Sequence, residues 1–309
     1  MFSITSVIIS YLICHTYGLS DSQILSDNYD DALDSEISPY HVSLKLLSTE
    51  EHICSGAIIH KKYVITAANC LEDHDSADIV VDVGNNELYI PENRYIAYSL
   101  IIHPHYNKTQ NINDIGLINL TKEIGFNKYI KSIDLISYDE NFEGHVFITA
   151  HWRKFWSFNL EHLQKINVTG FSQTSCGNTY LNITNKHICT IQMSQDTCDE
   201  KFGRPLTYKG NLVGILGNML SFGKWPCVVS TLPDVFTKVY YYRQWINDTI
   251  NADSKIYHYS QSIDNSINVG INEQFNFFGP IFIFRSYIQD RLKYSLKKSR
   301  INQRTTLAS

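Results

Sequence analysis

The sequence predicts an all-β domain, built as a barrel or a sandwich, that ends in one helix. Between residues 39 and 220, short segments rich in β-branched and aromatic residues alternate with turns, as in YHVSLKLL, YVITAA and HVFITA. Many short strands with few helical stretches are typical of barrels and sandwiches. The segment that begins at Val235 differs, because its apolar residues recur at helical spacing and predict an amphipathic helix that closes the domain. These residues are Val239, Tyr242, Trp245, Ile246 and Ile250.

The composition is that of a globular protein, with 43% hydrophobic and 18% charged residues in a chain of 309. A net charge of -5 at pH 7 gives no indication of a nucleic-acid partner. Residues 2–14 are apolar and uncharged but too short to span a bilayer, and small residues follow them. We therefore expect a cleaved signal peptide at 1–18, an N-terminal segment at 19–38 and a secreted, extracellular protein. The alternatives are a wrongly assigned start and a buried strand.

Residues 251–309 differ from the rest of the chain. A polar, turn-rich stretch leads to the apolar run FNFFGPIFIF, and the chain is basic from Arg285 onward. This run is far shorter than the roughly 20 residues that a membrane span needs, so we expect no stable membrane insertion. We expect a disordered C-terminal extension with a basic end. A peripheral membrane contact and a gene-model artefact are the alternatives.

Cleavage near Gly18 would remove Cys14 and leave six cysteines. An even number in a secreted chain indicates three disulfides, although the spacing alone does not choose among the pairings. The spacings do not resemble a zinc-binding pattern, and we expect no metal and no other cofactor. Asn-X-Thr triplets, which accept N-linked glycans in secreted proteins, make five asparagines glycosylation candidates. They are Asn107, Asn119, Asn167, Asn182 and Asn247.

Several segments, taken in order, resemble the chymotrypsin/trypsin-like serine proteases. They cover residues 39–250 and include SPYHVSL, CSGAIIHKKYVITAANC, NDIGLINL, DTCDEKFGRPLTYKGNLVGIL and PDVFTKVYYYRQWI. The resemblance implies two six-stranded antiparallel β-barrels with a cleft between them and a C-terminal α-helix. It also implies one set of disulfides, namely Cys54–Cys70, Cys176–Cys189 and Cys198–Cys227.

The resemblance places the catalytic histidine at Asn69, the aspartate at Asp114 and the nucleophilic serine at Phe202. Acyl transfer needs a base whose pKa lies near neutrality and a nucleophile that this base activates. The amide of Asn69 is not a base near neutral pH, and the phenyl ring of Phe202 has no nucleophilic atom. Glu200 stands where a glycine contributes to the oxyanion hole, and its charge would repel the developing oxyanion. Only Asp114 remains of the triad, and we expect it to be a buried structural acid.

Two further family features are altered at the matching positions. In the family, activation frees the N-terminus of a tetrapeptide, and its ammonium pairs with an aspartate. Here the tetrapeptide falls on DNYD at 27–30, and Lys201 stands in place of the aspartate. Asp196 matches the acid that selects basic substrates, but Met219 and Asp234 replace glycines that keep the specificity pocket open. We expect both acids to face this pocket, where a cation of the chain itself neutralises and occludes it. The alternative is that Asp196 is solvated in an open cleft. The nearby cations are Lys201, Arg204 and Lys224. Lys201 is favoured because its position has lost its family partner.

These features indicate a secreted, catalytically inactive serine protease homologue that acts by binding an unidentified protein partner. Such homologues occur in arthropods, where insect members act as immune cofactors and expanded sets in parasitic mites act on host complement. No cysteine lies between Cys14 and Cys54, so the clip domain of many insect cofactors is missing, which favours the mite type. That resemblance alone implies host immune or complement components as partners. The alternative function is an active serine endopeptidase with trypsin-like specificity.

Overall fold

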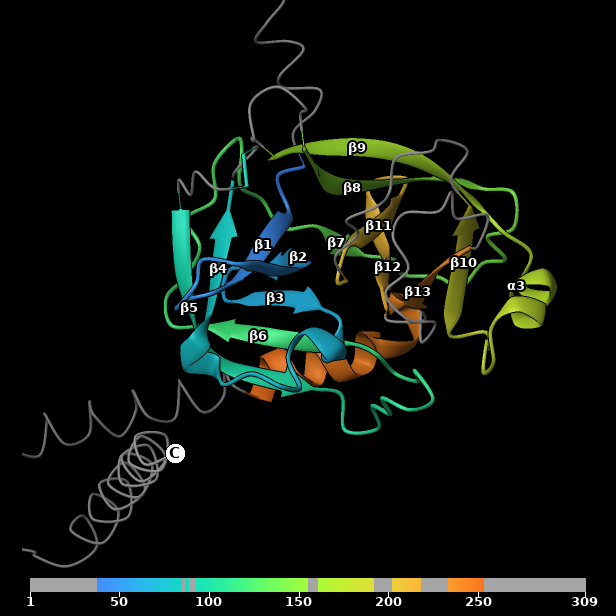
Figure 1. Ribbon diagram of the computed structural model, residues 1–309, viewed down its shortest axis with the longest axis horizontal. Coiled ribbons are helices and arrows are strands. Elements are labelled where there is room, and N and C mark those ends of the chain that lie inside the picture. The colour runs from blue at the N-terminus through green and yellow to red at the C-terminus, as the bar shows by residue number, and fades with distance from the viewer. Residues whose placement is uncertain are drawn as a thin grey trace, which may run out of the picture. The chain divides into compact units, whose positions relative to one another are not determined.

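Two β-barrels form the body of the protein (Figure 1). The computed structural model describes residues 38–84, 87–88, 93–154, 161–191, 202–217 and 233–252, and the expected signal peptide and the residues after 252 lie outside these ranges. Within them, each barrel has six strands that run antiparallel to their neighbours, and a short helix follows the last strand. The fold class predicted from the sequence is therefore confirmed.

The first barrel closes through its first and fourth strands. Its order is β1-β2-β3-β6-β5-β4, and β4 pairs back onto β1. Aliphatic side chains, many of them β-branched and so suited to strands, fill the core at Val42, Leu44, Ile58, Ile65 and Leu117. The strands are β1 (His41–Leu46), β2 (His52–His60), β3 (Tyr63–Thr66), β4 (Ile79–Val83), β5 (Asn93–Ile102) and β6 (Gly116–Leu120). Two 3-10 helices, η1 (Ala68–Cys70) and η2 (Ser76–Asp78), lie between β3 and β4.

The second barrel closes through a hairpin of two neighbouring strands. The sheet order is β11-β8-β9-β10-β13-β12, and the pairing of β12 with β11 completes the ring. A short strand, β7 (Asp134–Leu135), adds to β12 in parallel. Phe142, Phe147, Val168, Leu206 and Phe236 form its core. The strands are β8 (Val146–Lys154), β9 (Glu161–Gly170), β10 (His187–Ile191), β11 (Pro205–Tyr208), β12 (Asn211–Leu216) and β13 (Asp234–Lys238).

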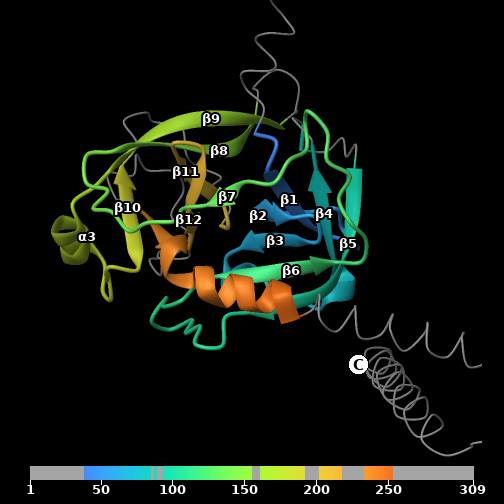
Figure 2. The same ribbon diagram turned by 180° about the vertical axis from the view of Figure 1, so that it is seen from behind.

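The C-terminal helix begins later than its apolar pattern suggested. Residues from Val235 to Lys238 belong to β13, the 3-10 turn η3 (Val239–Tyr242) follows, and residues 243–252 are helical. β13 pairs with both β10 and β12, so pairing with distant strands overrides the local helical spacing. Figure 2 shows the helix beside β6, where the Tyr242 and Trp245 rings meet His103 at centroid distances of 5.2 and 4.9 Å. No helix within the described ranges is long and apolar enough to cross a bilayer.

The structure contains two of the three disulfides that the resemblance implied. Cys54–Cys70 joins β2 to η1, and Cys176–Cys189 joins the helix α3 (Gln173–Thr179) to β10. Their sequence separations are 16 and 13 residues. In the chain-entropy view, each loop closure of this length stabilises the fold by about 2–4 kcal/mol. The third predicted pair, Cys198–Cys227, lies outside the described residues.

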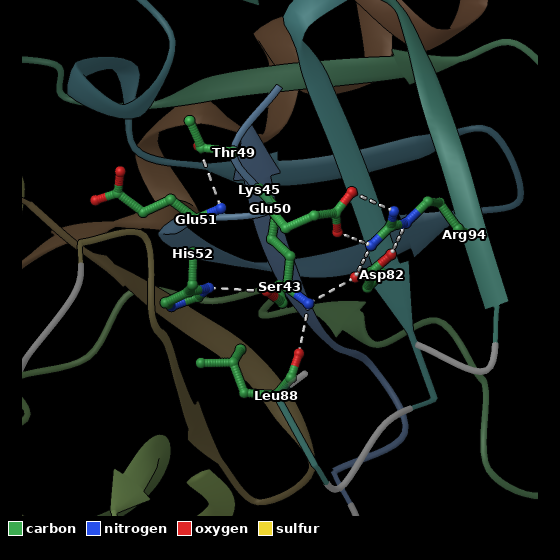
Figure 3. A network of polar contacts seen from close by, with 9 residues as sticks. All are labelled: Ser43, Lys45, Thr49, Glu50, Glu51, His52, Asp82, Leu88 and Arg94. Atoms are coloured by element: carbon green, nitrogen blue, oxygen red, sulfur yellow. Dashed lines mark hydrogen bonds and ion pairs between the residues drawn. The ribbon is translucent and has the colours of Figure 1, made fainter. Parts of the chain in front are cut away.

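Charged side chains from three strands of the first barrel form a network (Figure 3). The Lys45 ammonium of β1 lies 2.9 Å from a carboxylate oxygen of Asp82 on β4, and both side chains are buried. Arg94 of β5 binds the same carboxylate at 2.7 Å and also contacts Glu50 at the surface. Removing one partner of a buried ion pair typically costs about 3–5 kcal/mol, because the other charge stays in an environment of low dielectric constant. Asp82 therefore ties the three strands together in addition to their backbone pairing.

Two buried histidines of the first barrel lie against Trp152 of β8 in the second barrel. His41 on β1 and His52 on β2 approach the Trp152 ring edge-on, at centroid distances of 5.9 and 6.3 Å. Burial, with smaller contributions from His52, Arg204 and His151, lowers the pKa of His41 to about 3. In the described part of the chain no carboxylate opposes this shift. The interface between the barrels therefore requires a neutral His41.

We expect this interface to be acid-sensitive. Unfolded His41 binds a proton below about pH 6.5, whereas folded His41 stays neutral down to about pH 3, so stability falls as the pH drops through this window. The loss from this one group approaches about 4 kcal/mol at the acid end.

Urea unfolding across the window measures this effect, and His41→Gln should lose less stability on acidification than the unchanged protein. His60→Gln, a substitution at the exposed end of β2, should alter the acid response much less. Equal acid responses of His41→Gln and the unchanged protein would contradict the assignment.

Candidate functional site

Asp114, which the resemblance assigns to the triad, is a buried carboxylate just before β6. The backbone N–H of Asn69 donates to Oδ1 at 2.9 Å, and the Asn69 side-chain amide donates to Oδ2 at 2.7 Å. Asn69 lies on η1, and the next residue, Cys70, is fixed to β2 by a disulfide. The disulfide therefore helps to hold the amide against the carboxylate. The structure brings two of the predicted site residues into direct contact.

The loop that carries Asp114 is bound by both barrels. The backbone carbonyl of Asp114 accepts a hydrogen bond from the Thr237 hydroxyl of β13 at 3.0 Å. Asn113 has a φ of 55°, a left-handed conformation that asparagine tolerates better than most residues. Its side-chain amide donates to the His105 carbonyl at 2.7 Å. The Tyr242 hydroxyl donates to Asn113 Oδ1 at 2.9 Å. Burial raises the pKa of Tyr242, and the charge of Asp114 raises it further, so the hydroxyl remains a donor.

Phe202 begins a short segment that hydrogen bonds hold between the two barrels. The Ser55 N–H of β2 donates to the Phe202 carbonyl at 2.8 Å. On the other side, the Gly203 N–H donates to the Leu216 carbonyl at 2.8 Å, and the Leu216 N–H donates to the Arg204 carbonyl at 2.9 Å. Gly203 has a φ of 80°, and a Cβ there would collide with the Ser55 carbonyl, so only glycine fits. Backbone contacts thus fix this segment whatever side chain stands at position 202.

Arg204 is almost completely buried, and its Nη2 lies 3.4 Å from Oδ2 of Asp234 on β13. The separation is long for a hydrogen bond but within the range of an ion pair. Of the three cations considered from the sequence, Arg204 is the one that the described residues place against Asp234. The preference for Lys201 stays a prediction, because its position is not described. Outside the described residues lie Asp196, Glu200, Lys201, Met219 and Lys224.

The contact between Asn69 and Asp114 supplies hydrogen bonds but no proton relay. The amide nitrogen is a donor without an available lone pair, and the amide oxygen is too weak a base to take a proton from an alcohol. Within the described ranges, no group of three or more His, Cys, Asp or Glu residues is arranged to hold a metal ion. A cavity of about 380 Å³ lies on the second barrel, against Phe142, His187 and Lys238, and its lining includes neither residue of this contact.

The five glycosylation candidates differ in exposure. Asn119 lies on β6, between β3 and β5, and its side chain is only 7% exposed. This burial opposes a glycan at Asn119 in the folded protein. The other four side chains are exposed, at Asn107, Asn167, Asn182 and Asn247.

Comparisons with known proteins identify the family. The sequence pattern of the trypsin family matches residues 30–246. Chymotrypsin-2 of Vespa crabro is 33% identical over 211 residues, which cover 67% of this chain and 92% of the relative. Trypsin alpha of Drosophila melanogaster is 30% identical over 225 residues, covering 70% of this chain and 85% of the relative. The chain belongs to the trypsin family.

A solved structure resembles the fold as well. It is neuropsin, a serine protease expressed in the limbic system of mouse brain, with a TM-score of 0.58 and 27% sequence identity. The match covers 69% of this chain and 94% of neuropsin. The part of the chain that matches is thus a nearly complete protease domain of this family.

Three residues that position Asp114 were not predicted from the sequence. They are Asn113, Thr237 and Tyr242, which lie in a loop, a strand and a turn that are far apart in the chain. Tyr242 belongs to the apolar pattern of the C-terminal segment, which identifies it as buried but not as a hydrogen-bond donor. A buried tyrosine hydroxyl needs a partner, and this requirement is the one signal that the sequence offered.

We expect Asn69→Ala to destabilise the protein by about 1–3 kcal/mol, because the buried carboxylate of Asp114 loses the hydrogen bond from the Asn69 side-chain amide. Asn69→Asp should cost more at neutral pH, since two carboxylates then meet, and its deficit should shrink on acidification as the pair takes up a proton. Urea unfolding at neutral and acid pH measures both effects.

Asn69→His is the matched control for this series, because an imidazole N–H can replace the amide donor and keep stability closer to that of the unchanged protein. Full stability of Asn69→Ala would show that the contact with Asp114 contributes nothing to the fold.

Proposed function

We propose that this member of the trypsin family is a catalytically inactive homologue that acts by binding another protein. One observation carries the proposal: at the position that the resemblance gives to the catalytic histidine, Asn69 donates two hydrogen bonds to Asp114. The residue in that role must accept a proton from the nucleophile and return it to the leaving group. The Asn69 amide donates a hydrogen bond to Asp114, but it has no basic atom that can take up the proton of a nucleophile.

The nucleophile position supports the same proposal. Hydrogen bonds of Ser55 and Leu216 hold the segment from Phe202 to Arg204 on both sides, so the backbone offers a rigid place for a nucleophile. The phenyl side chain has no oxygen or sulfur to attack a carbonyl carbon. Loss of either base or nucleophile typically costs on the order of 10⁴–10⁶ in turnover, and here both are proposed to be lost.

The second candidate function is an active endopeptidase with trypsin-like specificity. It is favoured by the similarity to trypsin alpha, whose name states that class of enzyme. Such activity would need a base and a nucleophile from residues other than Asn69 and Phe202. The experiment below therefore tests both candidates at once.

We further infer that the protein is secreted. The apolar start of the sequence, the two disulfides and the four exposed Asn-X-Thr sites support an oxidising, extracellular destination. The proposed partner is a protein, and the resemblance to mite homologues makes a host immune or complement component the partner class to test first. Capture of that partner from host serum by the disulfide-intact protein, identified by mass spectrometry, would establish it.

We expect no covalent labelling of the intact protein by a fluorophosphonate probe, which reacts with activated serine nucleophiles. Asn69→His alone leaves no nucleophile, and Phe202→Ser alone leaves no base, so both variants should remain near background with arginyl and lysyl amide substrates. The double variant should also stay near background. Glu200 still repels the developing oxyanion, and Lys201 still replaces the aspartate with which the freed N-terminus would pair. An active trypsin serves as the positive control. Labelling of the unchanged protein would establish the endopeptidase instead.

The contact between Arg204 and Asp234 leads to a separate prediction about the specificity pocket. We propose that this resident guanidinium neutralises Asp234 and takes the place of a basic substrate side chain. Benzamidine is a small cation that fills an open acidic pocket, so calorimetry should detect no saturable binding to the unchanged protein. Saturable binding that Asp196→Ala abolishes would show that the pocket is open.

A further inference from the structure

A stripe of apolar side chains runs along one face of β8. Side chains alternate between the faces of a strand, so Val146, Ile148, Ala150 and Trp152 point the same way. Ala150 and Trp152 are 3% and 8% exposed, because Leu88 packs over this end of the stripe. Val146 and Ile148, at the other end, are 58% and 42% exposed. The chain thus covers one half of the stripe and leaves the other half open.

Asn167 of β9 lies directly opposite the open half. The register of the two strands pairs Ile148 with Asn167 and Val146 with Thr169. Residues that face each other in an antiparallel pair share one face, with Cβ atoms about 4.5–5.5 Å apart. Val168 between them is buried in the core of the second barrel, so Asn167 and Thr169 point outward together. Both residues that an N-glycosylation site requires therefore border the open apolar half.

We propose that Asn167 carries an N-linked glycan whose first sugars cover Val146 and Ile148. The proposal rests on the secretory route inferred above. Sugar rings have apolar faces formed by C–H groups, and such a face can replace water over the two aliphatic side chains. The glycan would do for this half of the stripe what Leu88 does for the other half.

The modification is a group transfer with no change of oxidation state. The Asn167 amide nitrogen attacks the anomeric carbon of a lipid-pyrophosphate-linked oligosaccharide, which the secretory pathway supplies. A carbon–nitrogen bond forms, the bond from the anomeric carbon to the phosphate oxygen breaks, and the amide nitrogen loses one proton. The lipid pyrophosphate leaves with the bonding electron pair.

The other exposed acceptor sites lack this combination. The side chains of Asn107 and Asn182 each form a hydrogen bond with Gln110, whereas none engages the Asn167 side chain in the described part of the chain. A glycan at Asn167 therefore disrupts no hydrogen bond among the described residues. Asn182 follows the exposed Leu181, which is a single residue and not a strand face.

The test begins with occupancy. The full chain is secreted from eukaryotic cells behind an established signal peptide, and enzymatic deglycosylation in heavy-oxygen water marks each occupied asparagine for mass spectrometry. We expect Asn167 to be occupied. An empty Asn167 beside an occupied Asn107 would overturn the proposal. A parallel chain with its own residues 1–18 tests the secretory route separately, because failure there leaves all sites empty in that chain alone.

The second part tests the covering of the apolar face. Asn167→Gln should bind a dye for exposed apolar surface several-fold more strongly than the glycosylated protein and should self-associate at lower concentration. Asn107→Gln is the matched control and should change neither. Adding Val146→Thr and Ile148→Thr to Asn167→Gln should restore both properties. Dye binding of Asn167→Gln equal to that of Asn107→Gln would overturn the covering role even where Asn167 is glycosylated.

Discussion

Asp114 is the buried residue at which hydrogen bonds from the two barrels meet. A carboxylate away from water is tolerated only when hydrogen bonds replace its hydration. Asn69 of the first barrel supplies an N–H to each oxygen, and Thr237 of the second barrel binds the carbonyl of the same residue. The loop before β6 is therefore fixed from both sides. Neither barrel can shift against the other without breaking a hydrogen bond to Asp114.

Charge imposes the second constraint on this interface. Arg204 is buried near His41, and its Nη2 lies 3.4 Å from Oδ2 of Asp234. Burial is the main reason that the pKa of His41 is lowered, and the charges of His52 and Arg204 lower it further, so His41 is accommodated only in its neutral form. The barrels thus combine one anchored anion, Asp114, with one anchored cation, Arg204. Acid pH disturbs this balance at His41, because no carboxylate is among the residues that set its pKa.

The sequence carried much of the fold because strands and disulfides leave local patterns. Short β-branched runs predicted the strands, and the family resemblance implied the two disulfides that are seen. The apolar spacing alone could not place the start of the C-terminal helix, since Val235 to Lys238 are strand only through pairing with β10 and β12. It also gave no sign of the ion pair between Lys45 and Asp82, which depends on strand register. The burial of Asn119 could not be predicted, because an Asn-X-Thr triplet contains no information on burial.

Under the proposed function, Asn69 keeps the structural role of its position without the chemical one. Position 69 supplies two hydrogen bonds to the buried carboxylate of Asp114, and losing a hydrogen bond to a buried group typically costs about 1–3 kcal/mol. Catalysis by this fold requires in addition that the donor be a base toward the nucleophile. Asparagine meets the first requirement and not the second. Under the proposed function, the fold therefore keeps its central hydrogen bonds while the reaction is lost, and a stable disulfide-linked scaffold remains for binding.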